Sequence, residues 1–129
     1  MLRHPWIGGT IALTLLLFPA TSALSAETAN FAAQTTRDLV RLCSAPESNE
    51  LHTTAMGYCL GFVDAATDYH AVITSGDLLE PVACPGRTVT RREVVDVFLA
   101  WARRNDALLD TEGPIHGLMR AASDKWPCN

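Results

Sequence analysis

Four cysteines constrain the fold of this chain more than any other feature: Cys43, Cys59, Cys84 and Cys128. No two of them have the C-x-x-C spacing of thioredoxin-like redox sites and the common zinc knuckles. An even number of cysteines in a small exported chain is typical of disulfide bonds that supplement a modest hydrophobic core. We therefore expect two structural disulfides and no catalytic or metal-binding cysteine.

Export itself is indicated by the N-terminus. Arg3 precedes the uncharged apolar run "IGGTIALTLLLFPA", and the small residues of "TSALSA" follow it. This order is that of a secretory signal peptide. The alternative, an uncleaved membrane anchor, is disfavoured because the run is short for a transmembrane span. We predict a signal peptide at residues 1–26, cleaved between Ala23 and Ala26, and a single periplasmic domain at 27–129 with no membrane contact.

The charge balance argues against nucleic acid as a partner. The chain has 10 basic residues (Lys and Arg) and 14 acidic ones, and the predicted signal peptide carries one of the basic residues and no acid. The mature domain therefore has 9 basic against 14 acidic residues, a formal charge of −5. Proteins that bind nucleic acid depend on a basic surface, which this composition does not supply.

Helical patterns cover most of the mature chain. Capping signals precede helices expected at about 36–43 and 91–104, and a glycine–proline pair begins another at about 114–126. The longest pattern predicts a helix at about 49–73, with its N-cap at Ser48 or Asn49. Because no segment has a convincing strand pattern, the predicted fold class is all-α: a small disulfide-stabilised bundle of four helices, or slightly more.

The long helix has two candidate packing faces. One is an apolar stripe at spacings of three and four: Ala55, Cys59, Phe62, Ala66, Tyr69 and Ile73. The other is a row of small residues four apart: Gly57, Gly61 and Ala65. Glycine inside a helix costs about 1 kcal/mol relative to alanine. The row therefore predicts a close approach of another backbone, within the domain or across a dimer, and glycines that are merely tolerated are the alternative.

Helix packing favours one pairing of the cysteines. If the first two helices form one antiparallel hairpin and the last two form another, the favoured disulfides are Cys43–Cys59 and Cys84–Cys128. The linker after the long helix could also carry Cys84 back along that helix. The other connectivities therefore stay open.

We found no motif for catalysis or cofactor binding. The G-x-S-x-G, H-E-x-x-H, P-loop and dinucleotide-binding patterns are absent, and no two histidines have the spacing of metal ligands. Asp64 and Asp68 lie away from the apolar stripe, which is more typical of a solvated face than of a paired-carboxylate site. We therefore expect no catalytic, cofactor-binding or metal-binding residue, and no enzyme activity.

Four segments in order resemble one protein family: "LVRLC", "GYCLGFVDA", "CPGRTVTRREVVDVFLAWAR" and a terminal "WPC". They are similar to the pattern of the Rap/Tai-type proteins. In that pattern a helix ends in a cysteine, a second helix carries glycines, a C-x-P-like loop leads into a third helix, and the chain closes with P-C. The resemblance covers residues 39–128. Characterised members are periplasmic immunity proteins. The resemblance therefore implies a homodimeric protein that blocks the active-site cleft of a peptidoglycan amidase effector of type VI secretion.

The loops depart from the family pattern, so the partner surface cannot be transferred from the resemblance. Two connections could supply it: 74–89 and 105–113. The second carries Leu108 and Leu109, which are apolar for a solvent loop and are our predicted partner-binding residues. The alternative is that these leucines cap the core.

Two other functions remain as alternatives. One is a small periplasmic helper, such as an HdeA-like acid-stress chaperone, and the other is a housekeeping family member without a toxin partner. Two disulfides and the lack of lysine-rich tails argue against the chaperone. A neighbouring gene for an amidase effector would favour immunity.

Overall fold

The computed structural model describes residues 31–76 and 79–128. Within them the fold consists of α-helices and one short 3-10 helix, with no strand. The elements in chain order are α1 Thr36–Cys43, α2 His52–Ile73, α3 Arg91–Ala102, η1 Asp106–Leu108 and α4 Pro114–Lys125. The predicted all-α class with four packed helices is confirmed. The predicted signal peptide lies outside the described residues.

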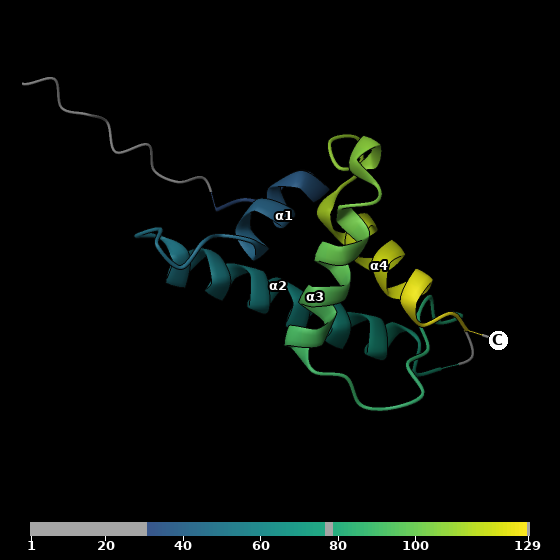
Figure 1. Cartoon of the computed structure of the whole chain (residues 1–129). Coiled ribbons are helices and arrows are strands. Elements are labelled where there is room, and N and C mark those ends of the chain that lie inside the picture. Colours follow the sequence, from purple (N-terminus) through teal and green to yellow (C-terminus); the bar gives the residue numbers. More distant parts are fainter. Residues whose placement is uncertain (1–30, 77–78, 129) are drawn as a thin grey trace, which may run out of the picture.

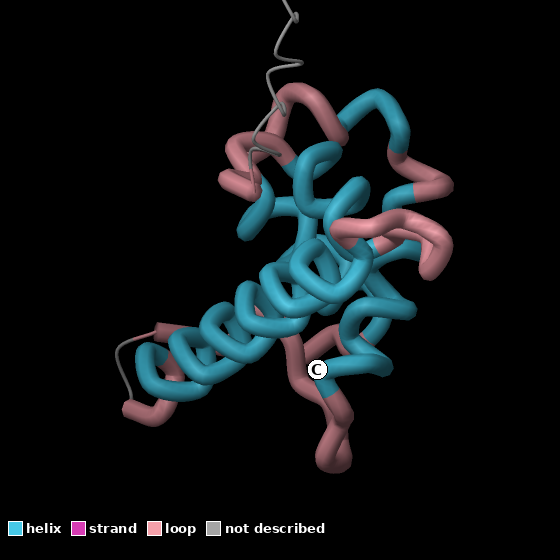
Figure 2. The backbone as a smooth tube through the Cα atoms, turned by 90° about the vertical axis from the view of Figure 1, so that its left-hand side faces the viewer, coloured by secondary structure: helices cyan, strands magenta, loops and turns pink. Residues whose placement is uncertain are grey.

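The shorter helices pack on one side of α2, which is the longest element at 22 residues. In Figure 1, α1 and α3 lie across α2, and α4 packs against α3 and α1. Figure 2 shows α2 as one continuous helix with the other helices gathered on one side of it. The opposite face of α2 is therefore not covered by another helix of the described chain.

Side chains from every α-helix meet in one core. Those with an exposed fraction of 1% or less include Leu39, Cys59, Val63, Phe98 and Leu118. The Trp101 ring is also buried, and its Nε1–H donates to Asp124 Oδ2 at 2.9 Å. The N–H of the buried indole therefore has a hydrogen-bond acceptor, as buried polar groups need.

Two helices begin at the predicted polar caps. The Thr35 hydroxyl accepts from the Asp38 backbone N–H, and the Asp38 carboxylate accepts from the Thr35 N–H at 2.9 Å. These reciprocal bonds form a complete capping box at the start of α1. Before α3, the Thr90 hydroxyl accepts from the Glu93 N–H. Local sequence therefore sets both helix starts.

The start of α2 differs from the prediction. The Asn49 N–H donates to Pro46 O at 2.9 Å, and Asn49 Oδ1 accepts from the Leu51 N–H at 2.8 Å. These bonds form a turn, and the helix begins only at His52, where Leu51 provides no side-chain cap. The predicted cap at Ser48 or Asn49 is wrong, because the Asn49 side chain stabilises the turn in place of the helix start.

The buried face of α2 follows the predicted stripe only in part. The buried residues are Ala55, Cys59, Val63 and Ala66. Phe62 is only half-buried and Tyr69 is 67% exposed, although both were expected in the core. Phe62 lies at the edge of the row formed by the four buried residues, so only part of its ring is covered. Tyr69 is exposed because burial ends at Ala66 and the last turns of α2 lie beyond the packed core.

Candidate interaction surface

Both disulfides join the pairs that helix packing favoured, Cys43–Cys59 and Cys84–Cys128. Cys43 and Cys59 are 3% and 0% exposed, and their bond joins α1 to α2 inside the core. Cys84 and Cys128 are exposed, and their bond joins the linker after α2 to the segment after α4. The first disulfide therefore belongs to the core, whereas the second holds two surface segments together.

The small-residue row of α2 faces solvent. Gly57, Gly61 and Ala65 are exposed, and a Cβ added to either glycine would meet no further atom within 4 Å. The expectation of a close contact within the domain is therefore wrong, because α1 and α3 pack against a different face of α2. A contact across a dimer stays a prediction.

The close helix contact lies at Gly117 of α4. A Cβ there would lie 2.2 Å from Thr36 Cγ2 and 2.5 Å from Thr36 Oγ1. Thr36 is fully buried, and its hydroxyl lies 2.9 Å from Gly113 O and 3.1 Å from Glu112 O. Sequence reasoning missed this pair, and its signal was a glycine in the middle of an amphipathic helix.

The connection between α3 and α4 is docked on the start of α1. The Thr36 N–H donates to Glu112 O and the Arg37 N–H donates to Leu109 O, both at 2.8 Å. These carbonyls satisfy N–H groups that the first turn of a helix leaves free. Leu109 is 4% exposed, and Leu108 is half-buried against the core. The expectation that both leucines are exposed is therefore wrong, because this connection closes the core over α1. A partner contact through the half-buried Leu108 stays a prediction.

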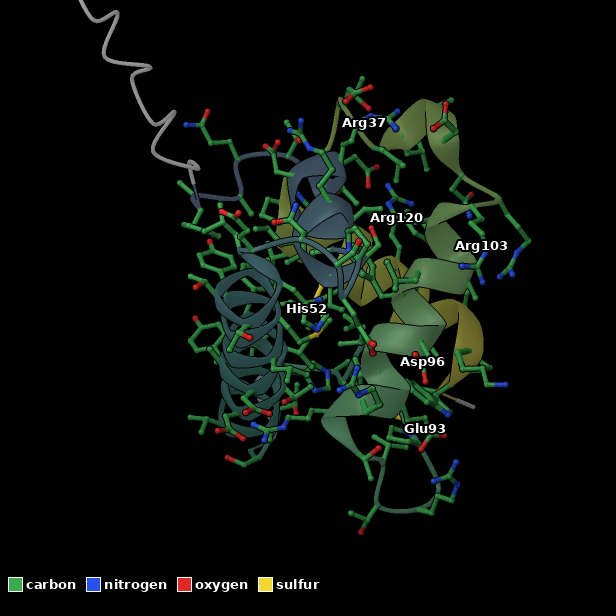
Figure 3. The ribbon with its side chains drawn as sticks, turned by 60° about the vertical axis from the view of Figure 1, so that its left-hand side comes forward. Arg37, His52, Glu93, Asp96, Arg103 and Arg120 are labelled. Carbon is green, nitrogen blue, oxygen red and sulfur yellow. A yellow bond between two sulfur atoms is a disulfide. The ribbon has the colours of Figure 1, made fainter. Side chains whose placement is uncertain are left out.

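Arg37 holds the same connection from outside. Its Nε donates to Asp110 Oδ1 at 2.7 Å, and its Nη1 donates to Asp106 Oδ1 at 3.1 Å. The hydrogen bond from Arg37 keeps the pKa of Asp110 below its usual value. Figure 3 shows Arg37 at the end of the molecule where η1 lies. A partner that bound the outer surface of this connection would therefore contact Asp106 and Asp110, which are already paired with Arg37.

An apolar cavity of about 220 Å³ lies between the end of α2, the linker and α4. Two hydrogen bonds attach the linker beside it: Val82 N–H to His70 Nε2 at 3.1 Å, and Cys84 N–H to Trp126 O at 2.8 Å. Because a backbone N–H can only donate, His70 accepts through an unprotonated Nε2. These two bonds therefore hold in place the linker residues that form one wall of the cavity.

A groove of about 420 Å³ lies between α3 and α4. Its charged lining residues are Glu93, Asp96, Arg104, Asp124 and Lys125. The ion pair with Arg87 holds the pKa of Glu93 below its usual value. Figure 3 shows Glu93 and Asp96 near the start of α3. Since both signs of charge line this groove, its charge does not select one kind of partner.

Within residues 31–76 and 79–128, no group of three or more His, Cys, Asp or Glu side chains is placed to hold a metal ion. In the same part of the chain, no helix has the length and apolarity needed to cross a membrane. Two of the histidines bond to the backbone: His52 Nδ1 lies 2.8 Å from Ala45 O, and His70 accepts from Val82. Both histidines therefore have structural roles.

The fold and its two disulfides define the class: a small, disulfide-braced, all-helical domain. Residues 35–128 match the family model of the Rap1a immunity proteins. The match spans more than half of the chain, so the protein belongs to the Rap1a immunity protein family. No curated protein and no solved structure shows significant similarity to it. The resemblance of its cysteine-bearing segments is confirmed at the family level.

Proposed function

We propose that this protein is a periplasmic immunity protein that binds and blocks a peptidoglycan amidase effector of type VI secretion, with no catalysis of its own. The observation that carries the proposal is membership of the Rap1a immunity family over residues 35–128. This range extends from the cap of α1 to the last cysteine, so it includes both disulfides. Family membership supports a toxin as the partner, and the amidase is the narrower part of the proposal.

The periplasm is supported by the cysteine chemistry and by the leader. Both disulfides are formed, and disulfides persist in oxidising compartments such as the periplasm. The N-terminal run with its small-residue cleavage site supplies the export signal. Cleavage between Ala23 and Ala26 would release the mature domain into the periplasm, which is the compartment where toxins that attack peptidoglycan act.

A blocking role is supported by the rigidity and the charge of the domain. A disulfide-braced surface is already ordered before it binds, so it loses little conformational entropy on docking. The mature domain has a formal charge of −5, with 9 basic against 14 acidic residues. Such a charge speeds association with a basic enzyme surface.

The proposal includes a homodimer that uses the uncovered face of α2. This face combines the small residues Gly57, Gly61 and Ala65 with Tyr69 and Val72, which are 67% and 70% exposed. Small residues allow two helices to approach closely, and the large side chains beside them add apolar area. A second copy packed there would cover a face that the monomer leaves in water.

The functional test is protection of a sensitive bacterium. Type VI amidase effectors, beginning with any encoded beside this gene, are exported to the periplasm with and without this protein, and lysis is followed by turbidity. The full chain should prevent lysis, and the purified proteins should form a complex with loss of amidase activity. The matched control is the chain without residues 1–26, which should fail to protect because it does not meet the effector.

Two outcomes would count against the proposal. If the full chain protects against no amidase effector and binds none, the amidase is the wrong partner. If the chain lacking its leader protects as well as the full chain, the periplasmic site of action is wrong.

A further inference from the structure

Among the described residues that line the apolar cavity, His70 is the only one with an ionisable side chain. The imidazole is half-buried, and its Nε2 accepts a hydrogen bond from the Val82 N–H at 3.1 Å. An imidazole nitrogen can accept only while it carries no proton, so this bond exists only with the neutral ring, protonated at Nδ1. A proton on Nε2 would replace the acceptor with a second donor that faces the Val82 N–H.

The bond to His70 is the main attachment of the first part of the linker, residues 79–83. Of these residues Leu79, Glu80 and Val82 are exposed, so the segment buries little apolar surface. Its other polar contact is weak: Pro81 O lies 3.3 Å from Cys128 Sγ, and a disulfide sulfur has no proton to donate. Segments with so few buried contacts open at low cost in free energy. Loss of the His70 bond should therefore free residues 79–83.

The next part of the linker stays attached in either case. The Cys84 N–H donates to Trp126 O at 2.8 Å, and the disulfide joins Cys84 to Cys128. In Figure 1 the linker lies beside the end of α4. Residues 79–83 can therefore swing about Cys84. Because Ala83 lines the cavity, this movement would open the cavity on that side.

No carboxylate compensates a charge on the His70 ring. The cavity residues contributed by α3, α4 and the linker are all uncharged. On another side of Val82, His116 and Arg120 of α4 line a surface hollow, and Arg120 is paired with Glu112. The carboxylates of the flanking elements are exposed or bonded to other side chains, and within the described chain none bonds to His70: Asp64, Asp68, Glu80, Glu93 and Asp124.

We propose that His70 is a pH-sensitive latch for the linker. The neutral ring holds residues 79–83 against the end of α2, and the protonated ring releases them and opens the apolar cavity to solvent. Imidazole side chains change charge between about pH 5 and pH 8. The latch is therefore closed at the upper end of this range and open at the lower end. It is a property of the domain itself and does not depend on the proposed immunity function.

The test is the exchange of the Val82 amide hydrogen in the purified protein, measured by NMR at pH 8 and pH 5. The protection factor compares the observed rate with that of an unstructured peptide at the same pH. It should be about fivefold to tenfold lower at pH 5, the size expected for loss of one hydrogen bond. The uncharged apolar dye Nile red should bind more strongly at pH 5, because the cavity is open. Helical circular dichroism should be the same at both pH values.

Three variants assign the effect to one ring. His70→Gln places a side-chain amide oxygen near the position of Nε2, and this acceptor does not titrate, so protection of the Val82 amide should persist at both pH values. His70→Ala removes the acceptor, so protection should be low at both. His116→Gln is the matched control, since His116 is the other histidine near Val82, and it should keep the wild-type difference between pH 8 and pH 5.

Several results would overturn the latch. One is equal protection of the Val82 amide at both pH values in the wild-type protein, and another is a pH dependence that survives in His70→Ala. Loss of the pH dependence in His116→Gln would assign the switch to the wrong histidine. A loss of helical signal at pH 5 would replace local release with unfolding of the domain.

Discussion

Gly117 is the residue at which α4 comes closest to α1. Any added Cβ would lie 2.2 Å from Thr36 Cγ2, and Thr36 is held by hydrogen bonds to the α3–α4 connection. We predict that Gly117→Ala lowers the free energy of unfolding by about 1–3 kcal/mol, as overpacking does in a close-packed core. Urea denaturation of the purified domain measures the change.

The matched control is the same substitution on the exposed face of α2. Gly61→Ala places its Cβ in open space in the monomer, so at protein concentrations too low for a dimer it should stabilise the helix by about 0.5–1 kcal/mol. Thr36→Ser keeps the hydroxyl but removes the clashing methyl group, so it should recover part of the loss when combined with Gly117→Ala. Equal effects of the two alanine substitutions would show that the α1–α4 crossing is looser than described.

Asp38 links stability to pH through the cap of α1. Hydrogen bonds, first from the Thr35 backbone N–H and then from the Thr35 hydroxyl and Arg41, lower the pKa of Asp38 to about 2 from 3.8. Because the folded pKa is depressed, the stabilisation is present above about pH 4 and is lost as the pH falls toward 2. Asp38→Asn should cost about 1 kcal/mol at neutral pH, a typical value for a cap.

The measurement is the free energy of unfolding between pH 7 and pH 2, by urea denaturation. The difference between wild type and Asp38→Asn should shrink as the pH falls, since the protonated carboxyl resembles the amide. Asp68→Asn is the control, because Asp68 is exposed and has no partner within the described residues. A difference that stays constant down to pH 2 would argue against the charged cap.

At the scale of elements, the two disulfides should differ in how easily they are reduced. Cys84 and Cys128 are exposed, whereas Cys43 and Cys59 are 3% and 0% exposed. A reductant reaches a sulfur only where it is accessible. Mild reduction should therefore produce a species with free thiols at Cys84 and Cys128 and an intact core disulfide.

Alkylation followed by peptide mass spectrometry identifies the free thiols. In that intermediate the linker should exchange its amide hydrogens faster, because it loses its covalent link to the segment after α4 and is held there by noncovalent contacts, such as its hydrogen bonds to His70 and Trp126. Full reduction should lower stability further, by about 2–5 kcal/mol for a native disulfide of a small secreted domain. Labelling of Cys43 at the same rate as Cys84 would refute this order of reduction.

At the scale of the whole molecule, the uncovered face of α2 predicts a dimer. A stable homodimer needs to bury on the order of 1,000 Å² or more in total. Gly61→Arg should dissociate it, because a long charged side chain would occupy the row along which the helices approach. Since Gly61 has open space around it in the monomer, the monomer should stay folded.

Sedimentation velocity over a range of concentrations measures the dimer. The control is Gly86→Arg, which makes the same change at an exposed glycine of the linker that also has open space around it. A wild-type protein that sediments as a monomer at every concentration would exclude the dimer. Identical association of both variants would place its interface away from α2.

The sequence by itself determined the four α-helices of this protein, the polar caps of α1 and α3, and its family. The capping box at Thr35 and Asp38, the cap at Thr90 and the helical periods involve residues a few positions apart, and such local interactions form wherever the segment lies. The favoured cysteine pairs followed from treating the helices as two hairpins, and both disulfides are present. Order and spacing of the cysteine-bearing segments were also sufficient to recognise the family.

Only the tertiary structure decided which faces are buried. The apolar stripe and the small-residue row of α2 are both compatible with helix packing. Periodicity alone does not specify which of these faces another helix will cover. From the sequence, Leu109 is indistinguishable from an exposed loop residue. It is buried because the α3–α4 connection packs on the first turn of α1. From the sequence, Gly117 is only a residue with low helix propensity. The structure shows that Thr36 lies against it and leaves no room for a Cβ. These outcomes depend on contacts between residues that are distant in the chain, and local pattern cannot specify such contacts.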